Sequence, residues 1–220
     1  MVVRQHVMNI SITGKESRQT TPWFVAIGAS GAEGLHDIQE LLAAFPGSLA
    51  AVVLIVLHRP WDRPTHLQSI LACVSKLPVI IAAKGEHLQA GTVYIGEPAE
   101  HLTLAAKSFG ELTDDPNNLY RNRTVDLLFR SLAAHGGSRI IGVVLSGWLD
   151  DGSHGLATIH DAGGLTMVLT PQGAWRRQGM PENAIGYDGP IDLIGDPRQI
   201  AAGICAAVRN QDEVQAPQPA

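Results

Sequence analysis

Short apolar runs that favour β-strands alternate with segments of helical period along most of the chain. The run Ala51–Leu57 (AVVLIVL) is continuously apolar, which is typical of a strand covered on both faces. The predicted strands are Trp23–Ile27, Ala51–Leu57, Val79–Ala82, Ile140–Leu145, Leu165–Leu169 and Ile191–Ile194. The predicted helices are Ala32–Ala44, Thr65–Ser75, Thr124–Ala134, Gly152–Ala162 and Pro197–Val208. This alternation predicts an α/β fold, a doubly wound and mostly parallel sheet with helices on both faces.

The middle and the two ends of the chain depart from this alternation. The apolar runs Thr92–Ile95 and Leu102–Ala105 are short and separated by turn residues, which predicts a small inserted β arm. Residues 109–122 (FGELTDDPNNLYRN) are polar and are predicted to form a loop. We interpret residues 1–21 as a flexible leader and residues 210–220 as a disordered tail. Residues 22–209 are therefore predicted to form one domain.

Three of the predicted strands are followed directly by residues that can carry chemistry. Ser30 lies in a glycine-flanked turn after the first strand, His58 ends the second, and Asp150 and Asp151 follow the strand at 140–145. In open parallel sheets, ligands bind beyond the carboxyl ends of the strands. A hydroxyl, an imidazole and a carboxylate that converge there are the groups that nucleophilic acyl transfer requires. The pattern favours a serine hydrolase in which either aspartate orients the histidine.

Each of these residues also has a purely structural interpretation. Ser30 can be the N-cap of the helix that follows it, because serine is a preferred N-cap residue. His58 can end its strand with its imidazole bonded to the backbone. Asp150 and Asp151 can both be N-cap residues of the predicted helix at 152–162.

Two further functional interpretations depend on glycines and histidines. Gly28, Gly31 and Gly34 resemble a degenerate dinucleotide-binding turn, but their spacing is G-x-x-G-x-x-G, and the second strand does not end in the expected acid. No cofactor is therefore predicted. His154 and His160 are six residues apart, a spacing that does not place them on one helical face, so no metal site is predicted.

Longer stretches around the strand ends resemble the CheB-type chemotaxis-receptor methylesterases. The turn at 27–30 (IGAS) is similar to that family's nucleophile turn, and 57–60 (LHRP) to its histidine segment, which usually reads Gln-His-Met-Pro. The stretch 145–152 (LSGWLDDG) is similar to the family's Leu-Thr-Gly-Met-Gly-x-Asp-Gly, in which the aspartate before the last glycine completes the triad. That register selects Asp151 over Asp150. Further matches, in the same order along residues 24–208, are GTVYI at 91–95, VDLLF at 125–129 and GMPENA at 179–184.

The resemblance implies hydrolysis of glutamyl γ-methyl esters, and deamidation of glutamine, on a methylated chemoreceptor or a similar signalling protein. Ser30 would be the nucleophile, His58 the base and Asp151 the orienting acid. The expected oxyanion and substrate-binding residues are Gly31, Arg59, Met180 and Trp148, the last through its backbone N–H. The chain departs from the family pattern at Gly31, which replaces the usual Thr, at Arg59, which replaces Met, and at Trp148-Leu149, which replaces Met-Gly.

These departures fall within the expected substrate crevice and leave a second hypothesis open, a binding or signalling module that keeps the fold with weakened catalysis. Hydrogen bonds from Ser30 to His58 and from His58 to Asp151 would favour the enzyme. About twenty residues precede the first strand, so the resemblance implies a catalytic domain without a receiver domain. Phosphorylation control would then come from a separate response regulator.

Composition narrows the classes of protein that the chain can belong to. Lys and Arg together number 16 and Asp and Glu 21, a net charge of −5 that argues against a nucleic-acid-binding surface. The longest apolar run is far too short to cross a bilayer, so no membrane insertion is expected. The two cysteines lie far apart in sequence and predict no disulfide framework. A cytoplasmic protein is the expectation that follows.

Overall fold

The computed structural model describes residues 21–59, 66–97, 100–114, 123–171, 179–187 and 189–214. The strands are β1 (Trp23–Ser30), β2 (Ala51–His58), β3 (Val79–Ile81), β4 (Thr92–Ile95), β5 (Glu100–Ala105), β6 (Phe109–Asp114), β7 (Ile140–Val144), β8 (Leu165–Leu169) and β9 (Leu193–Gly195). The helices are α1 (Gly31–Ala44), α2 (Leu67–Ala72), α3 (Thr124–His135), α4 (Ser153–Asp161), α5 (Met180–Gly186) and α6 (Pro197–Val214), with a 3-10 turn at Ala106–Ser108.

Seven of these strands form one parallel sheet in the order β3-β4-β2-β1-β7-β8-β9. The chain enters at β1 in the middle of the sheet and extends it first through β2 on one side. It then crosses to β7 on the other side, so the strand order reverses around β1. This is the doubly wound arrangement that the alternating pattern predicted, and the predicted fold class is confirmed. Ligands in such sheets bind where the order reverses.

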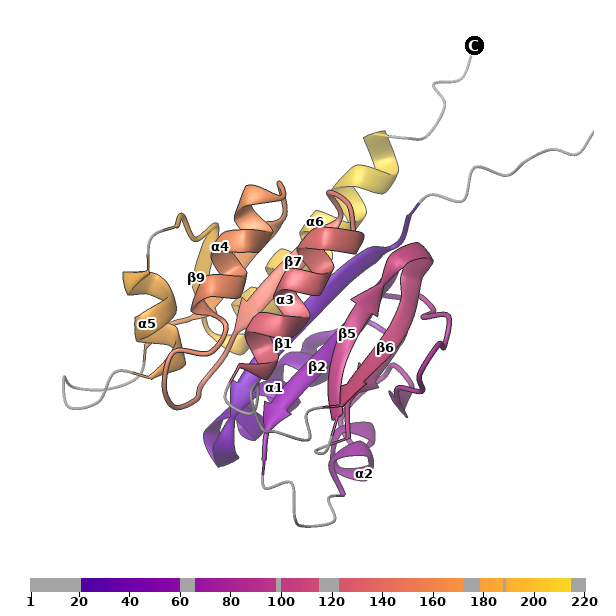
Figure 1. Cartoon of the computed structure of the whole chain (residues 1–220), viewed down its shortest axis with the longest axis horizontal. Coiled ribbons are helices and arrows are strands. Elements are labelled where there is room, and N and C mark those ends of the chain that lie inside the picture. The colour runs from indigo at the N-terminus through magenta and orange to yellow at the C-terminus, as the bar shows by residue number, and fades with distance from the viewer. Residues whose placement is uncertain are drawn as a thin grey trace, which may run out of the picture.

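Helices cover both faces of the sheet (Figure 1). One apolar core lies between the sheet and α1, α2 and α6, and includes Ile38, Leu41, Leu71 and Ile204. The other lies between the sheet and α3, α4 and α5, together with the ribbon formed by β5 and β6. Strands β1, β2, β4, β7 and β8 contribute alternate residues to the two cores, because successive side chains on a strand point to opposite faces.

The inserted β arm is present, but its strands differ from those predicted. Thr92–Ile95 belongs to the main sheet as β4, parallel to both β2 and β3, and all four of its residues are buried. The arm is instead the antiparallel pair β5 and β6, and β6 occupies part of the predicted loop at 109–122. Gly110 and Leu112 are the residues of β6 that pack against buried neighbours, too few apolar positions to show alternation in the sequence.

Two helices also differ from expectation. Residues 180–186, for which no helix was predicted, form the short helix α5, where the Glu182 carboxylate accepts a hydrogen bond from the Gly179 N–H. Seven residues are too few to reveal a helical period. Helix α6 continues to Val214, into the predicted tail, through polar residues that carry no apolar repeat. Residues 1–20 of the predicted leader and 215–220 of the tail lie outside the described residues. Within the described part of the chain, no helix is long and apolar enough to cross a membrane.

Candidate active site

Three adjacent strands bring the predicted residues to one edge of the sheet. Strand β1 lies between β2 and β7, and it ends at Ser30 while β2 ends at His58. The loop after β7 carries Asp151 and stays close to β1, because the Ser30 N–H donates to the Ser146 carbonyl over 2.9 Å. The strand ends therefore converge where the strand order reverses, as the sequence predicted.

Ser30 and His58 also share one face of the sheet. They are register partners at the ends of the parallel strands β1 and β2, so their side chains project in the same direction from neighbouring strands. Two residues earlier, Gly28 and Val56 pack on the α3 side of the sheet. Both predicted catalytic side chains therefore project toward the face that α3 covers.

The turn at Ser30 leaves its hydroxyl available for chemistry. Ser30 is the N-cap of α1 with extended backbone (φ −143°, ψ 142°), yet its side chain makes no capping hydrogen bond. Gly31 then has φ +72°, a left-handed conformation that strains any residue with a Cβ. This reversal produces the abrupt change from strand to helix. Ser30 therefore occupies the N-cap position of α1, but its side chain does not cap the helix.

Helix α3 packs closely against β1, the strand that carries Ser30. A Cβ added to Gly28 would lie 2.2 Å from a methyl carbon of Val125, in the first turn of α3. Glycine at this position thus allows the start of α3 to contact the strand that carries Ser30. A Cβ on Gly147 would likewise lie 2.8 Å from the Ser30 Cβ. Both glycines let backbone segments approach the proposed nucleophile.

Asp151 is the aspartate that contacts His58. Its Oδ2 lies 2.8 Å from His58 Nε2, and the residue is fully buried. The backbone N–H groups of Val125 and Asp126 donate to its two carboxylate oxygens over 2.9 Å each. The positive end of the α3 dipole further favours a negative charge there. Asp150 instead points toward Arg123, at 3.2 Å, with 47% of its side chain exposed.

The contact with Asp151 indicates which nitrogen of the His58 ring carries the hydrogen. A carboxylate accepts hydrogen bonds, so the nitrogen at 2.8 Å from it, Nε2, carries the proton. The opposite nitrogen, Nδ1, then holds the lone pair and is the atom that can act as a base. The His58 side chain is 19% exposed, so the ring is mostly shielded but still reaches solvent.

The second predicted contact is not formed. Among the described residues, no hydrogen bond joins the Ser30 hydroxyl to His58. Rotation of a serine side chain between staggered positions is a small motion, and catalytic hydrogen bonds commonly tighten only when substrate is bound. The structure therefore brings the pair onto one face, in register, without the bond between them.

Two polar residues that the sequence analysis missed complete the surroundings. Thr124 Oγ1 lies 2.8 Å from His58 Nε2. Asp126 is buried, and its Oδ1 accepts hydrogen bonds from the N–H groups of Gly152 and Gly155 at the start of α4. Burial raises the pKa of Asp126, and the nearby Asp151 charge raises it further, against the lowering effect of the Gly155 N–H. Both residues lie among the periodic apolar residues of a predicted helix, so the sequence pattern did not identify them as site residues.

The four remaining predicted site residues differ in how exposed they are. A Cβ placed on Gly31 would come within 4.0 Å of the Trp148 indole nitrogen, and Trp148 is 54% exposed. Arg59 donates to the Gly96 carbonyl over 2.7 Å, and burial lowers the pKa of its guanidinium. Met180 is fully buried and packs against Gly147, because a Cβ there would lie 2.2 Å from its sulfur. Its side chain thus supports the loop and does not offer a surface to substrate.

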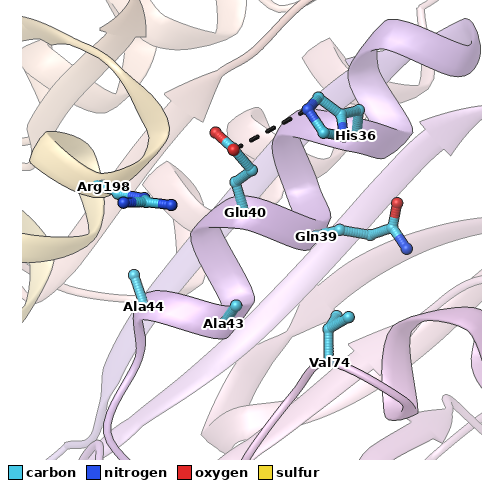
Figure 2. Close-up of a pocket in the computed structure, with 7 residues that line it drawn as sticks. All are labelled: His36, Gln39, Glu40, Ala43, Ala44, Val74 and Arg198. Carbon is cyan, nitrogen blue, oxygen red and sulfur yellow. Dashed lines mark ion pairs between the residues drawn. The ribbon is translucent and has the colours of Figure 1, made fainter.

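A separate groove of about 550 Å³ lies beside α1, and Figure 2 shows its lining residues. It is lined by His36, Gln39, Glu40, Ala43 and Ala44 of α1, with Val74 and Arg198. Helix α1 covers the face of the sheet opposite to α3. The groove therefore contains none of the predicted catalytic residues. In the described parts of the chain, no group of three or more His, Cys, Asp or Glu side chains is placed to hold a metal ion.

Comparisons with known proteins agree with this geometry. A family model described as CheB methylesterase matches residues 25–204. The chain is 33% identical over 189 residues to a protein-glutamate methylesterase/protein-glutamine glutaminase of Cupriavidus pinatubonensis, covering 84% of this chain and 54% of that protein. A protein of the same name from Shewanella oneidensis is 30% identical, with 84% and 52% covered. The chain thus spans about half the length of these curated relatives.

A solved structure shows the same architecture. The crystal structure of the Thermotoga maritima CheB methylesterase catalytic domain superposes with a TM-score of 0.74 at 26% identity. The match covers 85% of this chain and 99% of that one. The similarity therefore extends over nearly the whole of that catalytic domain.

Proposed function

The chain belongs to the CheB methylesterase family, and from this membership we propose that it is a serine hydrolase that cleaves glutamyl γ-methyl esters on a protein. The contact between His58 Nε2 and the buried Asp151 carries the proposal, because it supplies an oriented base on the same sheet face as Ser30. The reaction releases methanol and regenerates a glutamate carboxylate.

In the proposed mechanism, the Ser30 hydroxyl attacks the ester carbonyl as His58 Nδ1 takes its proton. The tetrahedral intermediate collapses with cleavage of the bond between the carbonyl carbon and the methoxy oxygen, and Nδ1 returns the proton to the departing methanol. Water then attacks the resulting acyl-serine with the same base, which releases glutamate and restores Ser30. The imidazolium that forms at each step is stabilised through Nε2–H by the Asp151 carboxylate.

The same machinery fits the second activity in the relatives' names. A glutamine side chain presents an amide where the ester presents a methoxy group, so attack by Ser30 would release ammonia instead of methanol. The relatives are named protein-glutamine glutaminases as well as methylesterases. We extend that activity to this chain as part of the proposal.

Substrate contacts are proposed for three of the residues identified in the sequence. The Trp148 backbone N–H would stabilise the oxyanion, and its indole lies beside the turn at Gly31. Arg59 follows His58 directly and would line the same crevice. A Cβ on Gly31 would have the indole nitrogen as its single neighbour within 4 Å, and we assign the open space above this glycine to the ester group.

The proposed partner is a methylated chemoreceptor or a similar signalling protein, and the proposed location is the cytoplasm. The activities in the relatives' names require a protein substrate that carries methylated glutamate or glutamine side chains. Both cysteines of the described structure are free thiols, as expected in a reducing compartment. Control through a separate response regulator is a further part of the proposal.

Methanol release from several methylated receptors tests the proposed function. The wild-type chain is expected to release methanol, and Ser30→Ala to be slower by at least about 10⁴-fold, because only the binding and oxyanion contributions remain. Ser69→Ala, on the exposed side of α2, is the matched control and should keep full activity. Full activity in Ser30→Ala would refute the mechanism. If the wild-type chain binds methylated receptor without releasing methanol, the binding-module hypothesis is correct instead.

A further inference from the structure

One nitrogen of the His58 ring has two oxygen neighbours. Nε2 lies 2.8 Å from Asp151 Oδ2 and also 2.8 Å from Thr124 Oγ1. Nε2 can carry only one hydrogen, and the carboxylate requires that hydrogen to be present. An unprotonated Nε2 would place its lone pair against a carboxylate oxygen, an arrangement in which two acceptors face each other. The Nε2–H is therefore shared between the carboxylate and the threonine hydroxyl oxygen.

The start of α3 fixes both of these oxygen atoms. Thr124 is the first residue of the helix, and the next two residues donate their backbone N–H groups to Asp151. Val125 also packs against Gly28 of β1, so the same turn is anchored to the strand that carries Ser30. The threonine oxygen and the carboxylate thus keep fixed positions relative to each other and to the strand ends.

Two fixed acceptors constrain the imidazole more than one does. With Asp151 alone, Nε2 could swing around the carboxylate oxygen and still keep that bond. The second acceptor at Thr124 restricts this swing, because Nε2 must stay within hydrogen-bond distance of both oxygens, and the ring that carries Nδ1 is restricted with it. When Nδ1 takes a proton the ring becomes a cation, and hydrogen bonds from a charged donor are about twice as strong as neutral ones.

We propose that Thr124 is a positioning residue of the active site, which shares the Nε2–H of His58 with Asp151 and thereby orients Nδ1 toward Ser30. This role rests on the proposed function only for its catalytic consequence. The shared hydrogen bond itself is a property of the folded chain and can be tested without substrate.

The test compares Thr124→Val with Thr124→Ser. Valine keeps the shape of threonine but removes the oxygen, so kcat is expected to fall about tenfold with little change in KM. Loss of an acceptor destabilises the imidazolium, so the acid limb of the kcat profile is expected to move to lower pH. Serine restores the oxygen and is expected to restore both values.

Nuclear magnetic resonance of the His58 ring provides the readout that needs no activity. The chemical shift of Nε2 is expected to change in Thr124→Val, because its N–H loses one acceptor, and to return in Thr124→Ser. The charged side chains of the surrounding elements, Arg59, Arg123, Asp126 and Asp151, are the same in all variants. Thr158→Val is the matched control, since Thr158 donates to the His154 carbonyl within α4. Neither its kinetics nor the Nε2 chemical shift of His58 should change.

The outcomes separate the two proposals. If the wild-type chain releases no methanol from any receptor, the proposed function fails, while the Nε2 chemical shift still decides the role of Thr124. If Thr124→Val lowers only the melting temperature and leaves the Nε2 chemical shift unchanged, Thr124 is a structural residue and the inference is overturned. Should Thr124→Val not fold, Thr124→Ala removes the same oxygen with a smaller side chain and is measured in its place.

Discussion

The carboxylates at the carboxyl edge of the sheet and those along the outer side of α1 differ in what surrounds them. In the described residues, the three buried carboxylates are Asp37, Asp126 and Asp151, and each accepts a backbone N–H. In the groove on α1, Glu40 contacts His36 over 4.0 Å, and 39% and 72% of the two side chains are exposed. One region holds charge at fixed positions, and the other leaves its charges in solvent.

The difference shows where this fold holds charged side chains at fixed positions. A buried carboxylate is unfavourable unless hydrogen bonds compensate for its lost hydration. Here the compensation comes from helix starts and from the loop after β7: Asp37 binds the Ser146 N–H, Asp126 the start of α4, and Asp151 the start of α3. These bonds connect the segments that carry the proposed triad. The groove on α1 has no comparable set among its described lining residues.

The largest effect within this comparison is expected at Asp151. Asp151→Asn should lower kcat by about 10³- to 10⁴-fold, because the amide can present a donor to His58 and favour the wrong ring tautomer. It should also lower the free energy of unfolding by about 1–3 kcal/mol, since two backbone N–H groups lose a charged acceptor. Steady-state kinetics and urea unfolding measure the two effects. Asp150→Asn, its exposed neighbour, is the control, and equal losses in both variants would refute the assignment of Asp151.

A smaller, pH-dependent effect is expected at Asp126. Burial raises the pKa of this carboxyl, so the folded chain holds its proton at pH values where the unfolded chain, with a pKa of about 3.9, has lost it. The free energy of unfolding of the wild type should therefore fall relative to Asp126→Asn as the pH rises above about 4. The difference should level off once Asp126 ionises in the folded state. Unfolding curves that stay parallel across this range would contradict the raised pKa.

The smallest effect is expected in the groove on α1. Glu40→Gln removes a charge that makes only a long, exposed contact with His36. The free energy of unfolding should change by less than about 0.5 kcal/mol, and methanol release should stay within about twofold of wild type. A large loss of activity in this variant would show that the two regions are coupled, and would remove the contrast between them.

Much of this arrangement could be predicted from the sequence. The apolar runs identified most strands of the parallel sheet, and with them the ends at Ser30 and His58. The family resemblance then selected Asp151 over Asp150, and the buried contact between Asp151 and His58 agrees with that choice. The features that were missed have physical reasons. Thr124 and Asp126 lie in the first turn of an amphipathic helix. The spacing of residues in the sequence does not show whether a polar side chain there bonds to a neighbouring segment or is exposed to solvent.

Other differences arise from local signals that were too short or too weak. The ribbon strand β6 has few apolar positions, and α5 is seven residues long. The burial of Met180 depends on Gly147 in a loop thirty-three positions earlier, a contact that no local pattern encodes. The missing bond between Ser30 and His58 depends on a side-chain rotation, which sequence does not specify.

The most direct test of the account is covalent labelling of the folded chain with a serine-reactive fluorophosphonate, followed by mass spectrometry of the peptides. An activated serine reacts with such a probe without any knowledge of the natural substrate. We expect a single modification at Ser30, and a rate at least about 100-fold lower in His58→Ala, which lacks the base. Modification at another serine, or an equal rate in His58→Ala, would contradict the assignment of Ser30 as the nucleophile activated by His58.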